Sequence, residues 1–339
     1  MTTRLVKVAV AIAVAIVLLV LVVPGFFGVA REAPIAQIVP FRLVTGLAAV
    51  AAAAVLVVLA VLVAPIRRLS LALAALGVAF AVVLAGVQGV RGYASAPPRA
   101  HRLADVRVVS WNILHDGVPP ETIAALVQEN AVDAVALLEV SRSRAEEVAD
   151  ALSAAGAPMT LHYAGEGGTD GSALLLSPGL GGYSVDPGSV ITGVTPSLVA
   201  RPDTPERPVL AAVHTMAPVP GRLAQWRSDL AGLARLCTAE EDVIVVGDLN
   251  STADHWAGLP GTASLGGCED ASALAGGAAL GTWPTSVPPA LGAPIDHVLF
   301  SGRWAVSGYF VVEDRDEAGS DHRPLVVQLS VRGLVKDSS

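Results

Sequence analysis

Three long stretches without a charged residue dominate the first hundred positions of this chain of 339 residues. They cover residues 8–30, 43–66 and 69–90, and each is 22 to 24 residues long. About 20 apolar residues suffice for a helix to cross the hydrocarbon core of a bilayer. A charge at the centre of such a helix costs roughly 3 kcal/mol on insertion scales. We therefore expect three transmembrane helices within a membrane domain of residues 1–91, rather than buried helices of a soluble core.

The first stretch has an alternative interpretation as a signal peptide. Arg4 and Lys7 precede it, and small residues end it at Gly28-Val29-Ala30. Its apolar part is longer than the usual signal-peptide core, which favours an uncleaved helix. Arg67-Arg68, between the second and third stretches, favours a cytoplasmic N-terminus. Both interpretations then predict an integral, multi-pass membrane protein whose C-terminal domain is extracytoplasmic.

The charge of the chain changes near residue 100. Of 22 basic and 30 acidic residues, only eight and one precede residue 101, which leaves 14 and 29 for the remainder, a formal net charge of −15. That remainder is long enough for one domain with its own core. We expect a linker over residues 92–104, a catalytic domain over 105–332 and a tail over 333–339. Such an acidic domain lacks the counterion release that drives nucleic-acid binding, so nucleic acid is not the favoured partner.

Short apolar, β-branched runs alternate with amphipathic stretches in this domain, which is typical of an α/β (α+β) fold with buried strands between helices. Predicted strands cover residues 106–110, 132–138, 172–176, 209–213, 243–246, 295–300 and 325–329, and predicted helices cover 120–130, 141–155 and 222–236.

Polar side chains stand at the ends of these predicted strands. Carboxylates and imidazoles beside buried strands are costly unless they are paired or bound to a metal, so the set predicts one converging site. Its members are Asn112, Glu139, His214, Asp248, Asn250, Asp296, Asp321 and His322.

In this order the residues resemble the endonuclease/exonuclease/phosphatase (deoxyribonuclease-I-like) superfamily, in a bacterial membrane-anchored form. The resemblance covers about residues 106–329. It implies a four-layer sandwich, with two mixed β-sheets between helices and a site at one rim. It also implies a Mg²⁺ cofactor, with Mn²⁺ as a substitute, and in-line attack of water on phosphorus.

The resemblance also assigns roles to single residues. Asn112, Glu139 and Asp321 would hold the metal, and Asp248 and Asn250 would orient the attacking water and hold phosphoryl oxygens. His322 would donate to a phosphoryl oxygen, with Asp296 fixing its tautomer. His214 would assist the phosphoryl oxygens or the leaving group, and Asp170 would be its carboxylate partner, where the deoxyribonuclease has a longer Glu.

Other residues invite structural interpretations. We expect His115 and Asp116 to form a loop turn, His297 to be structural and His255 to lie on the surface. Trp283 is either a packing residue or a platform for the substrate. Cys237 and Cys268 form either a disulfide, as exported domains favour, or two separate buried thiols.

Three functions compete at this point. The expected one is a phosphodiesterase or phosphatase acting on a lipid headgroup or a small organophosphate at the outer membrane face, with the bilayer and a phosphate ester as partners. A tethered nuclease of extracellular DNA or RNA is the second, and an inactive membrane scaffold is the third. The densest basic group, which would serve a nuclease, is Arg201, Arg207, Arg222 and Arg227.

Overall fold

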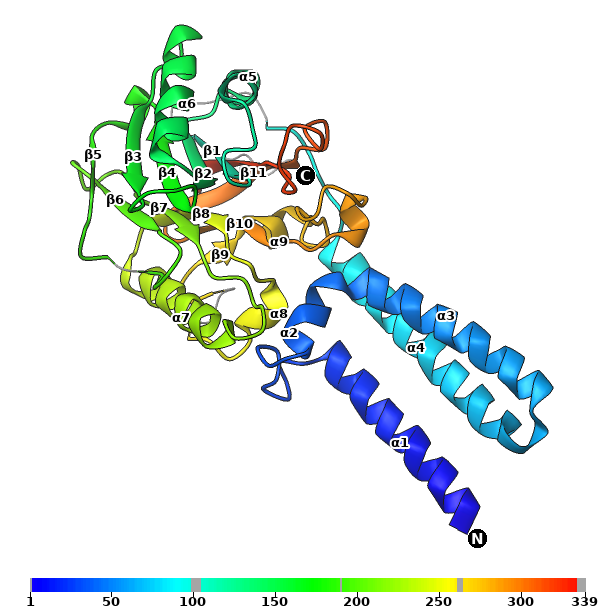
Figure 1. The fold of residues 1–339 in the computed structure, drawn as a ribbon. Helices are drawn as coiled ribbons and strands as arrows, with labels where there is room; N and C mark the ends of the chain where they lie inside the picture. The colour runs from blue at the N-terminus through cyan, green and yellow to red at the C-terminus, as the bar shows by residue number, and fades with distance from the viewer. Residues whose placement is uncertain (1, 99–104, 190, 261–264, 334–339) are drawn as a thin grey trace.

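The computed structural model describes residues 2–98, 105–189, 191–260 and 265–333 (Figure 1). Part of the predicted linker, residues 99–104, and most of the predicted tail, residues 334–339, lie outside the described residues.

Three long apolar helices extend from one side of the larger domain (Figure 1). They are α1 (Thr2–Val22), α3 (Arg42–Leu62) and α4 (Arg67–Arg91), and each is long and apolar enough to cross a membrane. Helix α1 ends before the predicted boundary at residue 30, because Pro24 disfavours helical geometry at the residue before it. Short helices α2 (Ile35–Ile38) and η1 (Val39–Phe41) join α1 to α3, and η2 (Ala64–Ile66) joins α3 to α4.

Small residues let α3 and α4 pack closely as an antiparallel pair. A methyl group added at Gly77 would lie 3.2 Å from the Ala49 carbonyl oxygen, and one at Gly46 would lie 3.7 Å from the Cα of Ala81. Close backbone approach of this kind is how helices associate in lipid, where burial of apolar surface gives no net drive.

Two six-stranded sheets form the centre of the larger domain. The first has the order β11-β12-β1-β2-β4-β3 and the second β5-β6-β7-β8-β10-β9. In each sheet one central pair is parallel, β1 with β2 and β7 with β8, and the other pairs are antiparallel. The strands are β1 (Val106–Asn112), β2 (Ala134–Val140), β3 (Thr160–Ala164), β4 (Gly171–Leu176), β5 (Tyr183–Val185), β6 (Leu198–Pro202), β7 (Val209–His214), β8 (Val243–Asp248), β9 (Glu269–Asp270), β10 (Asp296–Phe300), β11 (Trp304–Val311) and β12 (Leu325–Val331).

Helices cover the outer face of each sheet, which confirms the predicted four-layer sandwich. Strand β1 shows the layering: Val106 and Val108 pack between the sheets, whereas Val109 and Trp111 pack toward the outer helices. Burial on both faces explains why the strands read as continuous apolar runs. The helices are α5 (Pro120–Asn130) and α6 (Arg142–Ala154) on the first sheet, and α7 (Leu223–Ala239), α8 (Ala253–Trp256) and α9 (Ala271–Ala275) around the second, with η3 (Pro178–Leu180) and η4 (Pro289–Leu291) in loops.

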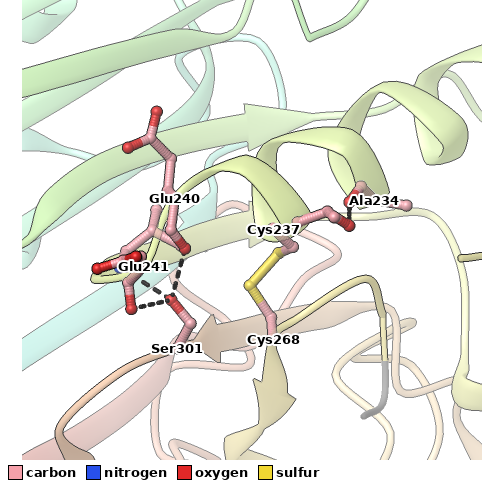
Figure 2. Close-up of a disulfide and its surroundings, with 8 residues drawn as sticks. Ala234, Cys237, Glu240, Glu241, Cys268 and Ser301 are labelled. Atoms are coloured by element: carbon pink, nitrogen blue, oxygen red, sulfur yellow. Dashed lines mark hydrogen bonds between the residues drawn. A yellow bond between two sulfur atoms is a disulfide. The ribbon is translucent and has the colours of Figure 1, made fainter. Parts of the chain in front are cut away.

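A disulfide joins Cys237 to Cys268 (Figure 2). Cys237 lies near the end of α7, and Cys268 immediately precedes β9 at the edge of the second sheet. The bond therefore ties the outer helix to the sheet that it covers, and it confirms the first of the two interpretations of the cysteine pair.

Candidate active site

The candidate site lies at the rim where three strands end and a fourth begins. Asn112 and Asp248 end β1 and β8, His214 ends β7, and Asp296 begins β10. Register places Asp248 directly opposite both His214 and Asp296. The sheets thus bring together side chains that are far apart in sequence, at the floor of a cavity of about 640 Å³.

An amide at the floor of this cavity links two carboxylates. Asn112 donates from Nδ2 to Glu139 Oε1 at 2.9 Å and to Asp248 Oδ2 at 3.2 Å. Its Oδ1 accepts the Leu114 N–H at 3.1 Å. In this arrangement Asn112 positions the two carboxylates, and its role as a metal ligand stays a prediction.

Glu139 reaches the cavity because β2 is irregular at this point. The register with β4 shifts between Leu138 and Val140, and Glu139 has a φ of 54°. A bulge of this kind turns a side chain away from the alternation of its strand. The Glu139 side chain is 18% exposed and lines the cavity, as expected for a group that receives a ligand.

His322 and Asp296 form the predicted imidazole–carboxylate pair, with 2.9 Å between Nδ1 and Oδ2. The main chain of His322 is fixed by Trp111, whose indole N–H donates to its carbonyl oxygen at 2.9 Å. Burial alone would lower the pKa of His322, but the carboxylates of Asp296 and Asp248 outweigh burial and raise it to about 9. The free Nε2–H is therefore a cationic donor, 3.8 Å from Asp248 Oδ2.

Asp248 is the centre of the cluster. Its Oδ1 accepts the Asn250 N–H at 2.9 Å, and its Oδ2 faces Asn112 and both histidines. Burial and the negative charge of Asp296 raise the pKa of Asp248 above its usual range. Asn250 donates from Nδ2 to the Thr215 carbonyl oxygen at 2.9 Å and lies 3.4 Å from Asp248 Oδ2, so it positions this carboxylate.

His214 joins the cluster, but Asp170 is not its partner. His214 Nε2 lies 3.8 Å from both Glu139 Oε1 and Asp248 Oδ2, and burial lowers its pKa to about 4. Asp170 is 76% exposed and instead faces His115, with 3.5 Å between Oδ1 and Nδ1. The predicted Asp170–His214 pair is therefore wrong. Asp170 faces His115, and His115 in turn faces Glu139, the carboxylate beside His214.

His115 is the site residue that the sequence analysis missed. Its Nε2 lies 3.3 Å from Glu139 Oε2, and its Nδ1 bonds to Thr169 Oγ1 at 3.0 Å. Positive φ angles at Leu114, His115 and Asp116 turn the ring into the cavity. The position of His115 three residues after Asn112 was the sequence signal that could have placed it at the site. The predicted turn role holds for Asp116, which accepts the Ser141 N–H at 2.7 Å.

Three further residues now have definite places. Trp283 lines the cavity and donates from its indole N–H to Asp321 Oδ2 at 2.8 Å. His297 is structural, as predicted, because it is buried beside Asp270. His255 is fully buried, so the predicted surface position is wrong; its Nε2 donates to the Ala36 carbonyl oxygen at 3.1 Å, at the contact with α2.

The donors at the floor of the cavity fit a hard divalent cation. Asp248, Asp296 and His322 lie close enough to share an ion, but Asp296 is already bonded to His322. Glu139 and Asp321, the predicted metal ligands, line the same cavity as Asp248, and Asp321 Oδ1 is buried with no hydrogen-bond partner among the described residues. Carboxylate oxygens are the ligands that Mg²⁺ prefers.

Comparison with known proteins supports the architecture. The chain is similar to a humanized D. rerio TDP2, with 16% identity and a TM-score of 0.54 over 67% of this chain and 100% of that chain. It is also similar to truncated Caenorhabditis elegans TDP2, with 18% identity and a TM-score of 0.50 over 67% of this chain and 98% of that chain. Identities this low establish the fold alone.

Sequence comparison identifies the family. No curated protein matches the chain significantly. The profile of the Endonuclease/Exonuclease/phosphatase family matches residues 109–322, which is more than half of the chain and includes the site from Asn112 to His322. The chain therefore belongs to the endonuclease/exonuclease/phosphatase family, whose members are metal-dependent phosphoesterases and nucleases.

Proposed function

We propose that this protein is a membrane-anchored, Mg²⁺-dependent phosphoesterase that hydrolyses a phosphodiester at the outer membrane face. The observation that carries this proposal is the convergence on Asp248 Oδ2. Asn112 Nδ2 lies 3.2 Å from that oxygen, and His214 Nε2 and His322 Nε2 each lie 3.8 Å from it. An acceptor for a proton and donors for phosphoryl oxygens thus meet at one point.

The residues divide the chemistry of hydrolysis between them. Asp248, held by Asn250, accepts a proton from the attacking water, for which a raised pKa is suited. His322 donates from Nε2 to a phosphoryl oxygen where negative charge develops, while Asp296 holds its other nitrogen. A divalent cation held by Glu139 and Asp321 would neutralise the phosphoryl group and stabilise the leaving oxygen.

The charge of the cavity favours a diester with a single negative charge. Among the described residues, no Lys or Arg lines the cavity, and its cationic side chain is His322. Even with one divalent cation bound, a monoester dianion or a polyphosphate would bring more negative charge than a diester to a floor that already holds Glu139, Asp248 and Asp321.

Two of the four basic residues that would serve a nuclease are engaged in ion pairs with carboxylates. Arg201 is bonded to Asp186 and Glu240, and Arg227 is bonded to Glu32. Contacts from basic side chains to phosphates usually position a nucleic acid on its protein. A nuclease is therefore the second candidate, and the D. rerio TDP2 complexed with single strand DNA product, which is 15% identical, supports it through the fold alone.

The test uses the full chain in detergent micelles with bis-p-nitrophenyl phosphate, p-nitrophenyl phosphate and supercoiled plasmid. We expect diester hydrolysis that requires Mg²⁺ and is lost in His322→Ala. His162→Ala, which changes a histidine on the edge strand β3, is the matched control and should keep the activity.

Two other results would replace the proposal. Plasmid nicking that disappears in His322→Ala would identify a tethered nuclease. No hydrolysis of any substrate, with no thermal shift on adding Mg²⁺, would favour the inactive scaffold.

A further inference from the structure

The segment that joins α1 to α3 is bonded to the catalytic domain. This segment, Ile35–Phe41, is called the connector below and comprises α2 and η1. His255 Nε2 donates to the Ala36 carbonyl oxygen at 3.1 Å, and Gln37 Nε2 donates to the Pro218 carbonyl oxygen at 2.5 Å. Two independent bonds therefore fix the connector at the mouth of the catalytic cavity.

The connector forms one wall of that cavity. Ala36, Gln37, Pro40 and Phe41 line it together with the catalytic residues. The Phe41 ring lies 5.9 Å from the ring of Trp283, whose indole bonds to Asp321. Phe41 of the connector thus contacts Trp283, the residue that holds Asp321 at the floor of the cavity.

Much of the rest of the cavity above its floor is also apolar. Met216, Ala217 and Val219 line it from the loop after β7, and Leu114 and Val194 line it from two other loops. Three of these are exposed: Val194 by 52%, Val219 by 46% and Leu114 by 39%. Apolar surface left open beside a polar floor is typical of a site that binds an apolar group.

The cavity also lies at the end of the apolar helices. Helix α3 begins at Arg42, directly after Phe41, so the cavity wall continues into a membrane-spanning helix. The loop between α1 and α2 carries Phe26 and Phe27, which are 85% and 40% exposed. Exposed aromatic side chains next to a span lie readily at the bilayer boundary, which puts the cavity mouth at lipid level.

We infer that the cavity takes an amphiphilic phosphodiester, with the phosphate at Asp248 and His322 and the apolar chain along the connector. The inference rests on the proposed function and selects a lipid over a small soluble organophosphate. Water adds to phosphorus, one P–O ester bond breaks, and the departing oxygen gains a proton, so the products are an alcohol and a phosphomonoester. Phe41 and Val219 determine specificity through contact with the chain.

Two probes that differ only in their apolar chain test this inference. Methyl p-nitrophenyl phosphate and hexadecyl p-nitrophenyl phosphate release the same chromophore from the full chain in detergent micelles with Mg²⁺. The measured quantity is the ratio of kcat/KM for the hexadecyl ester to kcat/KM for the methyl ester. We expect the native chain to favour the hexadecyl ester by about tenfold or more, from burial of several methylene groups.

Variants identify the wall that creates this preference. Phe41→Ala and Val219→Ser should each lower the ratio by about five- to tenfold. Val219 is exposed, so its substitution leaves the fold intact even if Phe41→Ala disturbs the connector. Phe27→Ala is the matched control, because Phe27 is an exposed aromatic residue near the same boundary that does not line the cavity; its ratio should equal that of the native chain.

The outcomes separate the inference from the proposed function. Hydrolysis of both esters with a ratio near one, or with a ratio that both wall variants leave unchanged, would overturn the inference and leave a soluble-substrate phosphoesterase. Release of no p-nitrophenolate from either ester, in the native chain as in His322→Ala, would refute the proposed function and the inference with it.

Discussion

Asp296 reaches the substrate only through His322, so it is a positioning residue. Asp296→Asn keeps the size of the side chain but removes the charge that stabilises the imidazolium. We predict a fall in kcat of about 100-fold or more, with KM little changed, because proton and charge stabilisation of this kind contributes roughly 10²- to 10⁴-fold. Steady-state kinetics on a p-nitrophenyl diester measure kcat and KM separately.

A second buried imidazole–carboxylate pair supplies the control. Asp270 and His297 are both buried with 3.4 Å between their polar atoms, but they do not line the catalytic cavity. Asp270→Asn should therefore lower the melting temperature more than it lowers kcat. Equal loss of kcat in both variants would show that Asp296 acts through stability alone.

Two carboxylates in the same cavity should differ greatly in importance. Glu139 is a predicted metal ligand; one of its side-chain oxygens accepts a hydrogen bond from Asn112, and the other faces His115. Asp170 is largely exposed, and its ion-pair partner among the described residues is His115. We predict that Glu139→Gln costs at least about 100-fold in kcat/KM and raises the Mg²⁺ requirement, whereas Asp170→Asn costs less than about threefold.

A Mg²⁺ titration of both variants makes this comparison. A large loss in Asp170→Asn would restore the catalytic pair with His214 that the sequence suggested and that the structure does not show.

Sequence reasoning located the residues at strand ends better than those in loops. Asn112, Asp248 and Asp296 follow or precede buried runs, where a polar group needs a partner, so their convergence follows from sheet topology. The contact of His115 with Asp170 depends on three successive left-handed residues, which leave no clear pattern in the sequence.

At the scale of elements, the disulfide holds α7 to the sheet that it covers. Cys237 and Cys268 are 31 positions apart. Closing a loop of this size stabilises a fold by about 3 to 4 kcal/mol in the chain-entropy account. We predict that the double variant Cys237→Ser/Cys268→Ser melts about 10 °C lower than the native chain, as scaled for a domain of this size.

Reduction supplies the matching experiment. Dithiothreitol should lower the melting temperature of the native chain to that of the double variant and should leave the variant unchanged. An identical melting temperature before and after full reduction, verified by thiol labelling, would contradict the predicted contribution.

The contact of α8 with the connector should depend on pH. His255 donates from Nε2 to Ala36, accepts the Thr252 N–H at Nδ1, and is held by burial at a pKa of about 4. Its pKa in an unfolded chain is about 6.5. The folded state binds fewer protons than the unfolded state as the pH falls below about 6.5. The contribution of His255 to the free energy of unfolding is therefore fully present above about pH 6.5 and is lost progressively toward pH 4, by about 3 kcal/mol at most.

Hydrogen exchange of the connector amides at pH 5 and pH 7.5 measures this dependence. His255→Gln keeps a donor of similar length but does not titrate, so its connector should exchange with little dependence on pH beyond the intrinsic rate. His214 titrates in the same direction in both proteins and cancels in the comparison. Equal pH dependence in the two proteins would rule out His255 as the origin.

Elements were predictable where both faces are buried. The seven predicted strands correspond to β1, β2, β4, β7, β8, β10 and β12, and the three predicted helices to α5, α6 and α7. The strands that were missed are β3, β5, β6, β9 and β11. All but β6 are edge strands, and β3, β5 and β9 are also short or half-exposed and lack a continuous apolar run. The register shift that turns Glu139 into the cavity also has no signal in the sequence.

At the scale of the whole molecule, one carboxylate fixes the catalytic domain on the apolar helices. Arg42 at the start of α3 and Arg91 at the end of α4 both bond to Asp254 at 2.7 Å. Burial alone would raise the pKa of Asp254, but the two guanidinium groups outweigh burial and lower it. The helix pair is thereby locked beside α8, which orients the cavity toward the connector.

This contact also accounts for the two basic residues at the domain end of α3 and α4. Arg42 and Arg91 are committed to docking the domain, so their position carries little information on topology. At the far end of the bundle, Lys7 donates to the Pro65 carbonyl oxygen at 2.5 Å, which sets the start of α1 beside the turn between α3 and α4. Arg67 and Arg68 lie at the same turn, where α4 begins.

We predict that this basic end faces the cytoplasm and that the catalytic domain faces outward. The positive-inside rule favours the cluster of Lys and Arg on the cytoplasmic side, and disulfides persist outside the cytoplasm. Val219→Cys should react with a membrane-impermeant maleimide in intact cells, and Arg68→Cys should react only after permeabilisation. Native Cys237 and Cys268 are bonded to each other and give no background. The opposite labelling pattern would place the active site in the cytoplasm, where the disulfide would not be maintained and the substrate would have to come from the inner leaflet.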